Sequence, residues 1–128
     1  MKGNPVSWFE IYVQDMARAR AFYQAVFQCE LTNMDNPDPE GFAGMEMWAF
    51  PFDMGGYGAS GALVKMAGYP SGGGTLVYFS CDDCGAEAAR AAAHGGSIFK
   101  HKAAIGTHGF IALVNDPEGN LIGLHSMQ

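Results

Sequence analysis

The stretch "VSWFEIYVQDMARARAFYQAVF", residues 6–27, contains the two patterns that decide the fold. Side chains in its first part alternate between two faces, as they do in a β-strand. One of these faces is apolar: Phe9, Ile11 and Val13. Asp15 follows at the position of a helix N-cap. The rest places apolar side chains at the spacing of an amphipathic helix: Ala19, Phe22, Val26 and Phe27. The stretch therefore predicts a strand, a turn and a helix.

A second stretch of the same kind begins at "TLVYFSC", residues 75–81. Its alternation also produces one apolar face: Val77, Phe79 and Cys81. Asp83 is a second candidate N-cap, and the Ala-rich segment "GAEAARAAAHGG" reads as a helix closed by glycines. The two caps lie 83 − 15 = 68 residues apart in a chain of 128. Because the chain is about twice this offset, we predict an internal duplication.

Each half continues with short apolar segments separated by turn residues, which predict three further strands per half. The expected strands cover residues 29–34, 45–50, 59–66, 97–101, 109–115 and 120–126. The predicted fold class is α+β, with two tandem βαβββ modules in one domain, residues 1–128. Module one covers 1–66, the Gly-rich stretch 67–74 is the linker, and module two covers 75–128.

Composition excludes several classes of partner. The net charge of −6 argues against nucleic acid, which needs a basic surface. No apolar segment is long enough to span a bilayer, and the N-terminal residues do not resemble a signal peptide. Three cysteines, an odd number, fit a reducing compartment. We therefore expect a cytoplasmic protein that does not bind membranes.

Four motifs follow one another along the chain: "WFEIYVQDMARARAFYQAVF", "GALVKM", "GTLVYFSCDD" and "GTHGFIALVNDPEGNLIGLHS". Their order and spacing resemble the vicinal-oxygen-chelate superfamily, which includes glyoxalase I, the bleomycin-resistance proteins and the extradiol dioxygenases. The chain looks most similar to small, poorly characterised glyoxalase-like proteins. The resemblance implies sheets curled around a cavity, a small-molecule ligand and a homodimer.

Metal-dependent members of this superfamily take four ligands from the first and last strands of the two modules. By resemblance, the corresponding positions here are Trp8, Leu76, Gly123 and the stretch Gly61–Leu63. An indole nitrogen only donates hydrogen bonds, and leucine, glycine and alanine have no coordinating atom in their side chains. We therefore expect no metal at the usual family site, and we predict no cofactor.

The strand face opposite the apolar one mixes aromatic and polar side chains, a composition typical of a small-molecule pocket. Its members are Trp8, Glu10, Tyr12, Leu76, Tyr78, Ser80, Leu121, Gly123 and His125. From this face we select Trp8, Tyr12, Leu76, Leu121 and Gly123 as binding residues.

Glu10 is the candidate general base, because a carboxylate among aromatic side chains loses solvation and its pKa rises. The alternative is a structural carboxylate, paired with His125 or with a backbone amide. Tyr78 and His125 are candidate groups that polarise or orient a substrate. Their alternatives are a wall aromatic and a histidine that is hydrogen-bonded within the wall or exposed.

Three functional hypotheses follow. The leading one is a glyoxalase-like protein that binds or transforms a small organic molecule without metal at the usual site. The second is a non-catalytic protein of the bleomycin-resistance type that sequesters a ligand between aromatic side chains, and an acidic chain favours a cationic ligand. The third is a metalloenzyme with relocated ligands such as Glu10 and His125. The pair Cys81 and Cys84 in "CDDC" is expected to be structural, since no second cysteine pair completes a zinc site.

Overall fold

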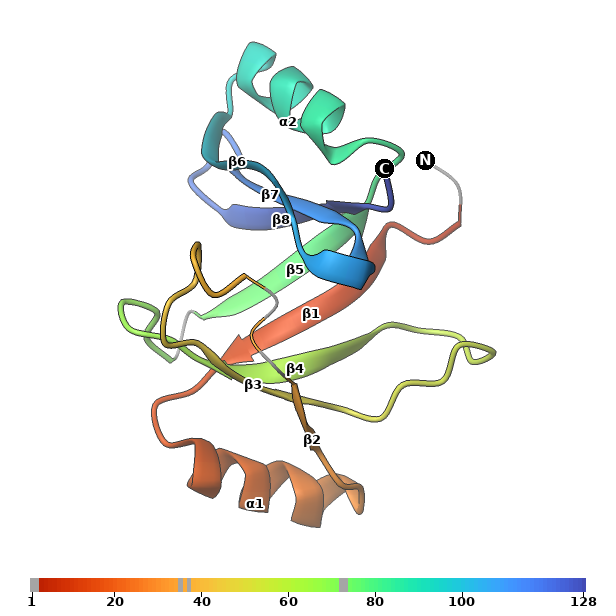
Figure 1. The fold of residues 1–128 in the computed structure, drawn as a ribbon, viewed down its shortest axis with the longest axis vertical. Helices are drawn as coiled ribbons and strands as arrows, with labels where there is room; N and C mark the ends of the chain where they lie inside the picture. The colour runs from red at the N-terminus through yellow and green to blue at the C-terminus, as the bar shows by residue number, and fades with distance from the viewer. Residues whose placement is uncertain (1–2, 35, 37, 72–73) are drawn as a thin grey trace. The chain divides into compact units, whose positions relative to one another are not determined.

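The computed structural model describes residues 3–34, 36, 38–71 and 74–128, and it contains the predicted βαβββ order twice (Figure 1). Residues 72–73 of the predicted linker lie outside this description. The first series is β1 (Val6–Tyr12), α1 (Met16–Phe27), β2 (Thr32–Met34), β3 (Glu46–Ala49) and β4 (Ser60–Lys65). The second is β5 (Thr75–Ser80), α2 (Cys84–Ala93), β6 (Ser97–Ala104), the short 3₁₀ helix η1 (Gly106–His108), β7 (Phe110–Asn115) and β8 (Leu121–Ser126). The predicted α+β class is confirmed.

The chain divides into two compact units. The N-terminal unit is Trp8–Thr75, and the C-terminal unit is Leu76–Gln128 together with the residues up to Ser7. In the N-terminal unit the strand order is β2-β3-β4-β1, with β1 parallel to β4 and the other pairs antiparallel. In the C-terminal unit the order is β5-β8-β7-β6, with β5 parallel to β8 and the other pairs antiparallel. The two halves therefore repeat one topology.

Both predicted helix caps are confirmed. The Asp15 side chain accepts a hydrogen bond of 3.0 Å from the amide of Arg18, and the Asp83 side chain accepts one of 3.0 Å from the amide of Gly85. Each bond satisfies an amide that the first helical turn leaves unpaired. Helix α2 ends at His94 and is followed by Gly95, whose positive φ of 97° allows the chain to turn toward β6.

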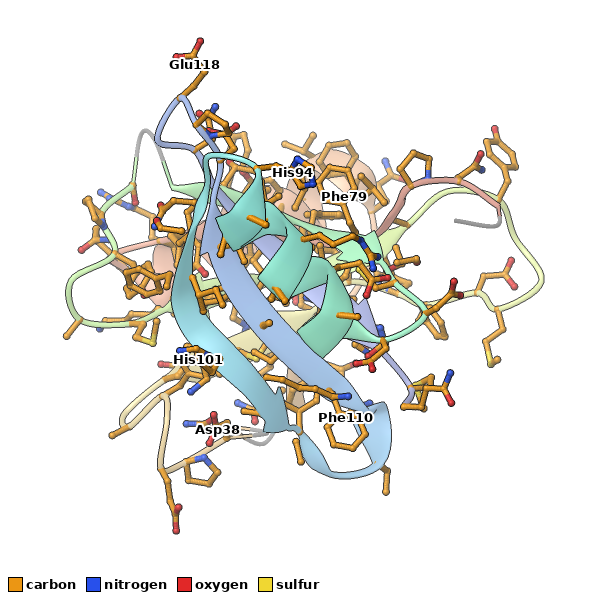
Figure 2. All side chains as sticks on the ribbon, turned by 90° about the horizontal axis from the view of Figure 1, so that it is seen from above. Asp38, Phe79, His94, His101, Phe110 and Glu118 are labelled. Carbon is orange, nitrogen blue, oxygen red and sulfur yellow. The ribbon has the colours of Figure 1, made fainter. Side chains whose placement is uncertain are left out.

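The core of the C-terminal unit lies between α2 and its own strands, and the predicted apolar face contributes to it. Figure 2 looks onto α2, which lies over β6 and β7. The buried cluster is Cys84, Ala88, Ala112, Val114 and Leu124, with Phe79, Cys81 and Ile122 among the partly buried side chains packed on it. Phe79 and Cys81, from the apolar face predicted for residues 75–81, thus contribute to this core together with Ile122 and Leu124 of β8.

In the N-terminal unit, α1 uses only part of its predicted apolar face. Its core contacts come from Met16, Ala19 and Tyr23, which pack with residues including Ile11, Val13, Leu31 and Leu63. Phe22, Val26 and Phe27, the other members of the predicted apolar face, are 59%, 54% and 63% exposed. The prediction is confirmed for Ala19 and wrong for the other three, because α1 has more than one apolar stripe at helical spacing. Packing against the sheet selects the stripe that starts at Met16.

Across the part of the chain that the structure describes, no helix has both the length and the apolar character needed to cross a membrane.

Candidate functional site

A buried carboxylate lies in β1. Glu10 is 7% exposed, and each of its two oxygens accepts a hydrogen bond from a side chain of the same strand. The Tyr12 hydroxyl donates to Oε1 at 2.9 Å, and the Trp8 indole Nε1 donates to Oε2 at 3.2 Å. Residues two apart on a strand point to the same face. The structure therefore brings Trp8, Glu10 and Tyr12 together as the strand pattern predicts.

The surroundings of Glu10 change its acidity. Burial raises the pKa of the Glu10 carboxyl above its ordinary value of 4.5, while the hydrogen bonds from Tyr12 and Trp8 lower the pKa by a smaller amount. Burial dominates because removing a carboxylate from water penalises its charged form. A carboxyl whose pKa is raised toward neutrality is better matched to proton transfer than an exposed one.

Strand β4 places no polar side chain directly opposite Glu10. In the parallel pairing of β1 and β4, Glu10 lies opposite Ala62, which is completely buried. One position earlier Phe9 lies opposite Gly61, where an added Cβ would come within 2.7 Å of two carbons of the Phe9 ring. The stretch Gly61–Leu63 thus contains no coordinating side chain, and at Gly61 it has no space for one.

Tyr69, a residue of the predicted linker, adjoins this site. The ring of Tyr69 stacks on the ring of Tyr12, with centroids 5.1 Å apart and an interplanar angle of 27°. Burial and the negative charge of Glu10 raise the pKa of the Tyr69 phenol above 10.0. The one signal in the sequence was a lone aromatic residue inside the Gly- and Pro-rich stretch 67–74.

In the C-terminal unit, Gly123 faces an aromatic ring. Tyr78 on β5 lies opposite Gly123 on β8, and a Cβ added at Gly123 would come within 2.6 Å of three carbons of the Tyr78 ring. Tyr78 is 6% exposed and Leu76 is 3% exposed. The ring of Tyr78 therefore fills the space that a side chain at position 123 would need.

His125 lies on the same strand, and its imidazole has a partner. Its Nε2 is 2.6 Å from the backbone carbonyl oxygen of His108. Because a carbonyl oxygen only accepts, the Nε2–H group donates this hydrogen bond. The bond links β8 to the exposed 3₁₀ helix η1. His125 and Leu121 are each half-buried, and Leu121 lies opposite Asn115 of β7.

Comparison with known proteins identifies the family. The model of the Glyoxalase/Bleomycin resistance protein/Dioxygenase superfamily matches residues 6–124. The chain belongs to this superfamily. No curated protein matches the chain.

Solved structures of this superfamily's fold are similar over nearly the whole chain. Methylmalonyl-CoA epimerase from Mycobacterium tuberculosis is 17% identical, with a TM-score of 0.68, and the match covers 97% of this chain and 88% of that one. A Streptomyces coelicolor methylmalonyl-CoA epimerase variant in complex with 2-nitronate-propionyl-CoA is 19% identical, with a TM-score of 0.69 and 96% of both chains covered. A hypothetical protein from Bacillus halodurans is 12% identical, with a TM-score of 0.71, covering 99% of this chain and 96% of that one. At these identities the likeness supports the fold.

At the four positions that the family resemblance assigns to metal ligands, the side chains do not fit a divalent ion. The indole of Trp8 already donates to Glu10, and Leu76, Gly123 and the stretch Gly61–Leu63 offer no side-chain donor atom. Within residues 3–34, 36, 38–71 and 74–128, no group of three or more His, Cys, Asp or Glu side chains is arranged to hold a metal.

Two further features contain none of the predicted site residues. The first is a groove of about 420 Å³ along the first turns of α1, lined by Val13, Gln14, Asp15, Arg18, Ala19, Phe22 and Ser71. It adjoins the site through Ser71, whose hydroxyl donates to the backbone carbonyl of Tyr12. Burial, with a smaller effect of the Glu87 charge, raises the pKa of the Cys81 thiol to about 11. Cys81 is therefore protonated at neutral pH, and a protonated thiol is a poor nucleophile and metal ligand.

Proposed function

We propose that this protein binds and transforms a small organic molecule, with Glu10 as the proton-transfer group and without a metal at the usual superfamily positions. The observation that carries the proposal is the buried Glu10 carboxyl, held by one side-chain donor on each oxygen. A carboxylate offers about four lone-pair positions. Trp8 and Tyr12 use two of them, which leaves acceptor capacity for a substrate proton.

The orientation of Glu10 supports this role. General acid–base catalysis requires a group that is held in place and whose pKa lies near the working pH. Trp8 and Tyr12 hold the carboxyl, and burial raises its pKa. As a carboxylate, Glu10 would take a proton from the carbon and leave the substrate as an enolate. The carboxylic acid formed would exchange its proton with water and then deliver a proton to the enolate carbon.

The reaction class that we propose is proton transfer at a carbon beside a carbonyl group. Two of the similar structures are of methylmalonyl-CoA epimerases. An epimerisation removes a proton from one face of a carbon and delivers one to the other face, so it needs a proton acceptor of this kind. We extend only this chemistry to the present chain, and not the coenzyme A substrate. For Tyr78 and His125 we retain the proposal that they polarise or orient a substrate, and for Leu76, Leu121 and Gly123 the proposal that they are binding residues.

A second candidate function is sequestration of a ligand without reaction. The specific observation in its favour is that the carboxyl is accompanied by three aromatic side chains, from Trp8, Tyr12 and Tyr69. Aromatic faces beside a negative charge suit an organic cation. The two candidates differ in whether a proton is exchanged.

The test is a thermal-shift screen of small carbonyl compounds and drug-like cations, followed by incubation of each hit in deuterated water. Proton NMR then detects loss of the signal from the carbon beside the carbonyl. We expect wild-type protein to catalyse deuterium incorporation, Glu10→Gln to bind without catalysing it, and Glu46→Gln, which alters an exposed glutamate, to behave as wild type. Equal incorporation by Glu10→Gln would contradict the proposal. Binding without incorporation by wild type would favour sequestration.

Metal analysis of protein purified without chelators tests the remaining hypothesis. One divalent ion per subunit, lost in both Glu10→Gln and His125→Ala, would indicate relocated ligands and would overturn the metal-free proposal.

A further inference from the structure

Hydrogen bonds connect the segment that follows β4 to the end of β1. The Ser71 hydroxyl donates to the backbone carbonyl of Tyr12 at 3.0 Å, and the amide of Tyr12 donates to the carbonyl of Gly74 at 2.8 Å. The Gln14 side-chain amide donates to the carbonyl of Tyr69 at 3.1 Å. A linker that only joins two modules would not need to bond with both the amide and the carbonyl of Tyr12.

These bonds place an aromatic ring on the partner of Glu10. A turn closed by the 3.2 Å bond from the Tyr69 amide to the Met66 carbonyl, with Gly68 at a φ of 87°, presents the Tyr69 ring. That ring stacks on Tyr12, whose hydroxyl donates to Glu10. The charge of Glu10 reaches Tyr69, since it contributes to the raised pKa of this phenol. Tyr69, Tyr12 and Glu10 therefore form one connected series.

We propose that Tyr69 is a positioning residue: its ring holds Tyr12 in the orientation that donates to Glu10 and shields the Tyr12–Glu10 pair from water. The inference rests on the proposed function, because it concerns the carboxyl that would transfer the proton. The segment 66–71 is then part of the site as well as a connection between modules.

The Tyr12–Glu10 bond depends on the orientation of the Tyr12 side chain. Its side chain reaches Glu10 along its own strand, so the Tyr12–Glu10 bond lasts only while the ring keeps one orientation. A stacked aromatic partner opposes other orientations. Trp8 and Tyr12 donate to the same carboxyl, so a Glu10 side chain released by Tyr12 also loosens its bond to Trp8.

The chain contains a matched reporter for this effect. Trp8 donates its indole N–H to Glu10, two residues later, at 3.2 Å, and Trp48 donates its indole N–H to Glu46, two residues earlier, at 3.1 Å. Glu10 is buried and Glu46 is exposed. Both pairs lie in the N-terminal unit, so the Trp48 indole reports any general loosening of this unit.

The experiment measures hydrogen exchange of the two indole N–H groups by NMR, without ligand, in wild type, Tyr69→Ala, Tyr69→Phe and Tyr57→Ala. Tyr57 is 103% exposed and serves as the control tyrosine. In Tyr69→Ala we expect exchange at Trp8 to accelerate roughly two- to tenfold, the factor expected from loss of an aromatic pair, with Trp48 unchanged. Tyr69→Phe keeps the ring and should match wild type, as should Tyr57→Ala.

Unchanged exchange at Trp8 in Tyr69→Ala, or equal acceleration at Trp8 and Trp48, would overturn the inference. If Tyr69→Ala does not fold, Gln14→Ala releases the Tyr69 carbonyl and should accelerate Trp8 exchange in the same direction, and no acceleration there would overturn it equally. Because no ligand is used, the result is independent of the deuterium-incorporation test. Failure of the proposed function and failure of this inference can therefore be told apart.

Discussion

The two halves of the chain differ most clearly at one pair of equivalent positions. Given the offset of 68 between the two helix caps, Glu10 in β1 corresponds to position 10 + 68 = 78, which is Tyr78 in β5. Both side chains are buried, and both lie opposite a small residue of a parallel strand, Ala62 and Gly123 respectively. One half thus carries a carboxyl where the other carries an aromatic ring.

This difference shows that equivalent backbone positions can hold an ionisable group in one half and an aromatic ring in the other. Glu10 obtains its two hydrogen-bond donors from its own strand, so it needs nothing from Ala62. The Tyr78 ring instead uses the space that a side chain at position 123 would need. At the positions that the family resemblance assigns to metal ligands, neither half has a side-chain donor atom that could hold an ion. The proton-transfer group that we propose, Glu10, therefore lies in the N-terminal unit.

The largest expected effect comes from removing the carboxyl. Glu10→Ala removes the carboxylate that accepts hydrogen bonds from the Tyr12 hydroxyl and the Trp8 indole N–H, which should lower the free energy of unfolding by roughly 2–4 kcal/mol. Glu46→Ala removes a similar bond at an exposed position and should change it by about 0.5 kcal/mol or less. Urea denaturation of both variants measures the difference. Equal losses would mean that Glu10 is no more integrated into the structure than Glu46.

The next largest effect is expected in the C-terminal unit, at Gly123. Gly123→Ala forces a methyl group against the Tyr78 ring and should lower the free energy of unfolding by about 1–3 kcal/mol. In a Tyr78→Ala background the ring is absent, so the same substitution should cost much less. Denaturation of the two single variants and the double variant gives the interaction energy directly. Additive effects would show that the ring of Tyr78 is not the reason for the glycine.

Local chemistry explains which parts of this arrangement could be predicted from the sequence. The caps Asp15 and Asp83 are short-range signals, and alternation along a strand was enough to put Trp8 and Glu10 on one face. The exposed stripe of α1 around Phe22 was mispredicted because helical spacing does not say which of several apolar stripes meets the sheet.

Contacts between distant residues could not be predicted in the same way. Tyr69 stacks on a residue 69 − 12 = 57 positions earlier, and His125 donates to the carbonyl of His108 in another element. The space of Gly123 is filled by Tyr78 only because β5 and β8 pair in one particular register. These contacts depend on which strands pair, in which register, and on the path of the loops between them. A local sequence pattern determines none of these.

The free energy of unfolding should depend on pH through Glu10. The pKa of Glu10 is raised in the folded protein, so the unfolded chain releases this proton at a lower pH than the folded chain does. The stability that Glu10 contributes is therefore fully present below its ordinary pKa of 4.5 and is lost as pH rises through the folded pKa. The loss is about 1.4 kcal/mol for each unit by which the pKa is raised.

Glu10→Gln does not titrate and provides the reference for this effect. The free energy of unfolding of wild type minus that of Glu10→Gln should fall as pH rises above 4.5, measured by urea denaturation at a series of pH values. A difference that is constant or that grows with pH would contradict a raised pKa. Glu46→Gln supplies the exposed control.

The smallest effect isolates a single hydroxyl. Tyr12→Phe removes the donor to Oε1 of Glu10 while keeping the ring that stacks on Tyr69, so it should lower the free energy of unfolding by about 1 kcal/mol. Because the Tyr12 bond lowers the pKa of Glu10, its loss should also raise that pKa further, which a carbon-13 NMR titration of the carboxyl detects. Tyr57→Phe, at a fully exposed tyrosine, should alter neither quantity. If the Glu10 titration does not move in Tyr12→Phe, the hydroxyl does not tune this carboxyl, and burial alone sets its acidity.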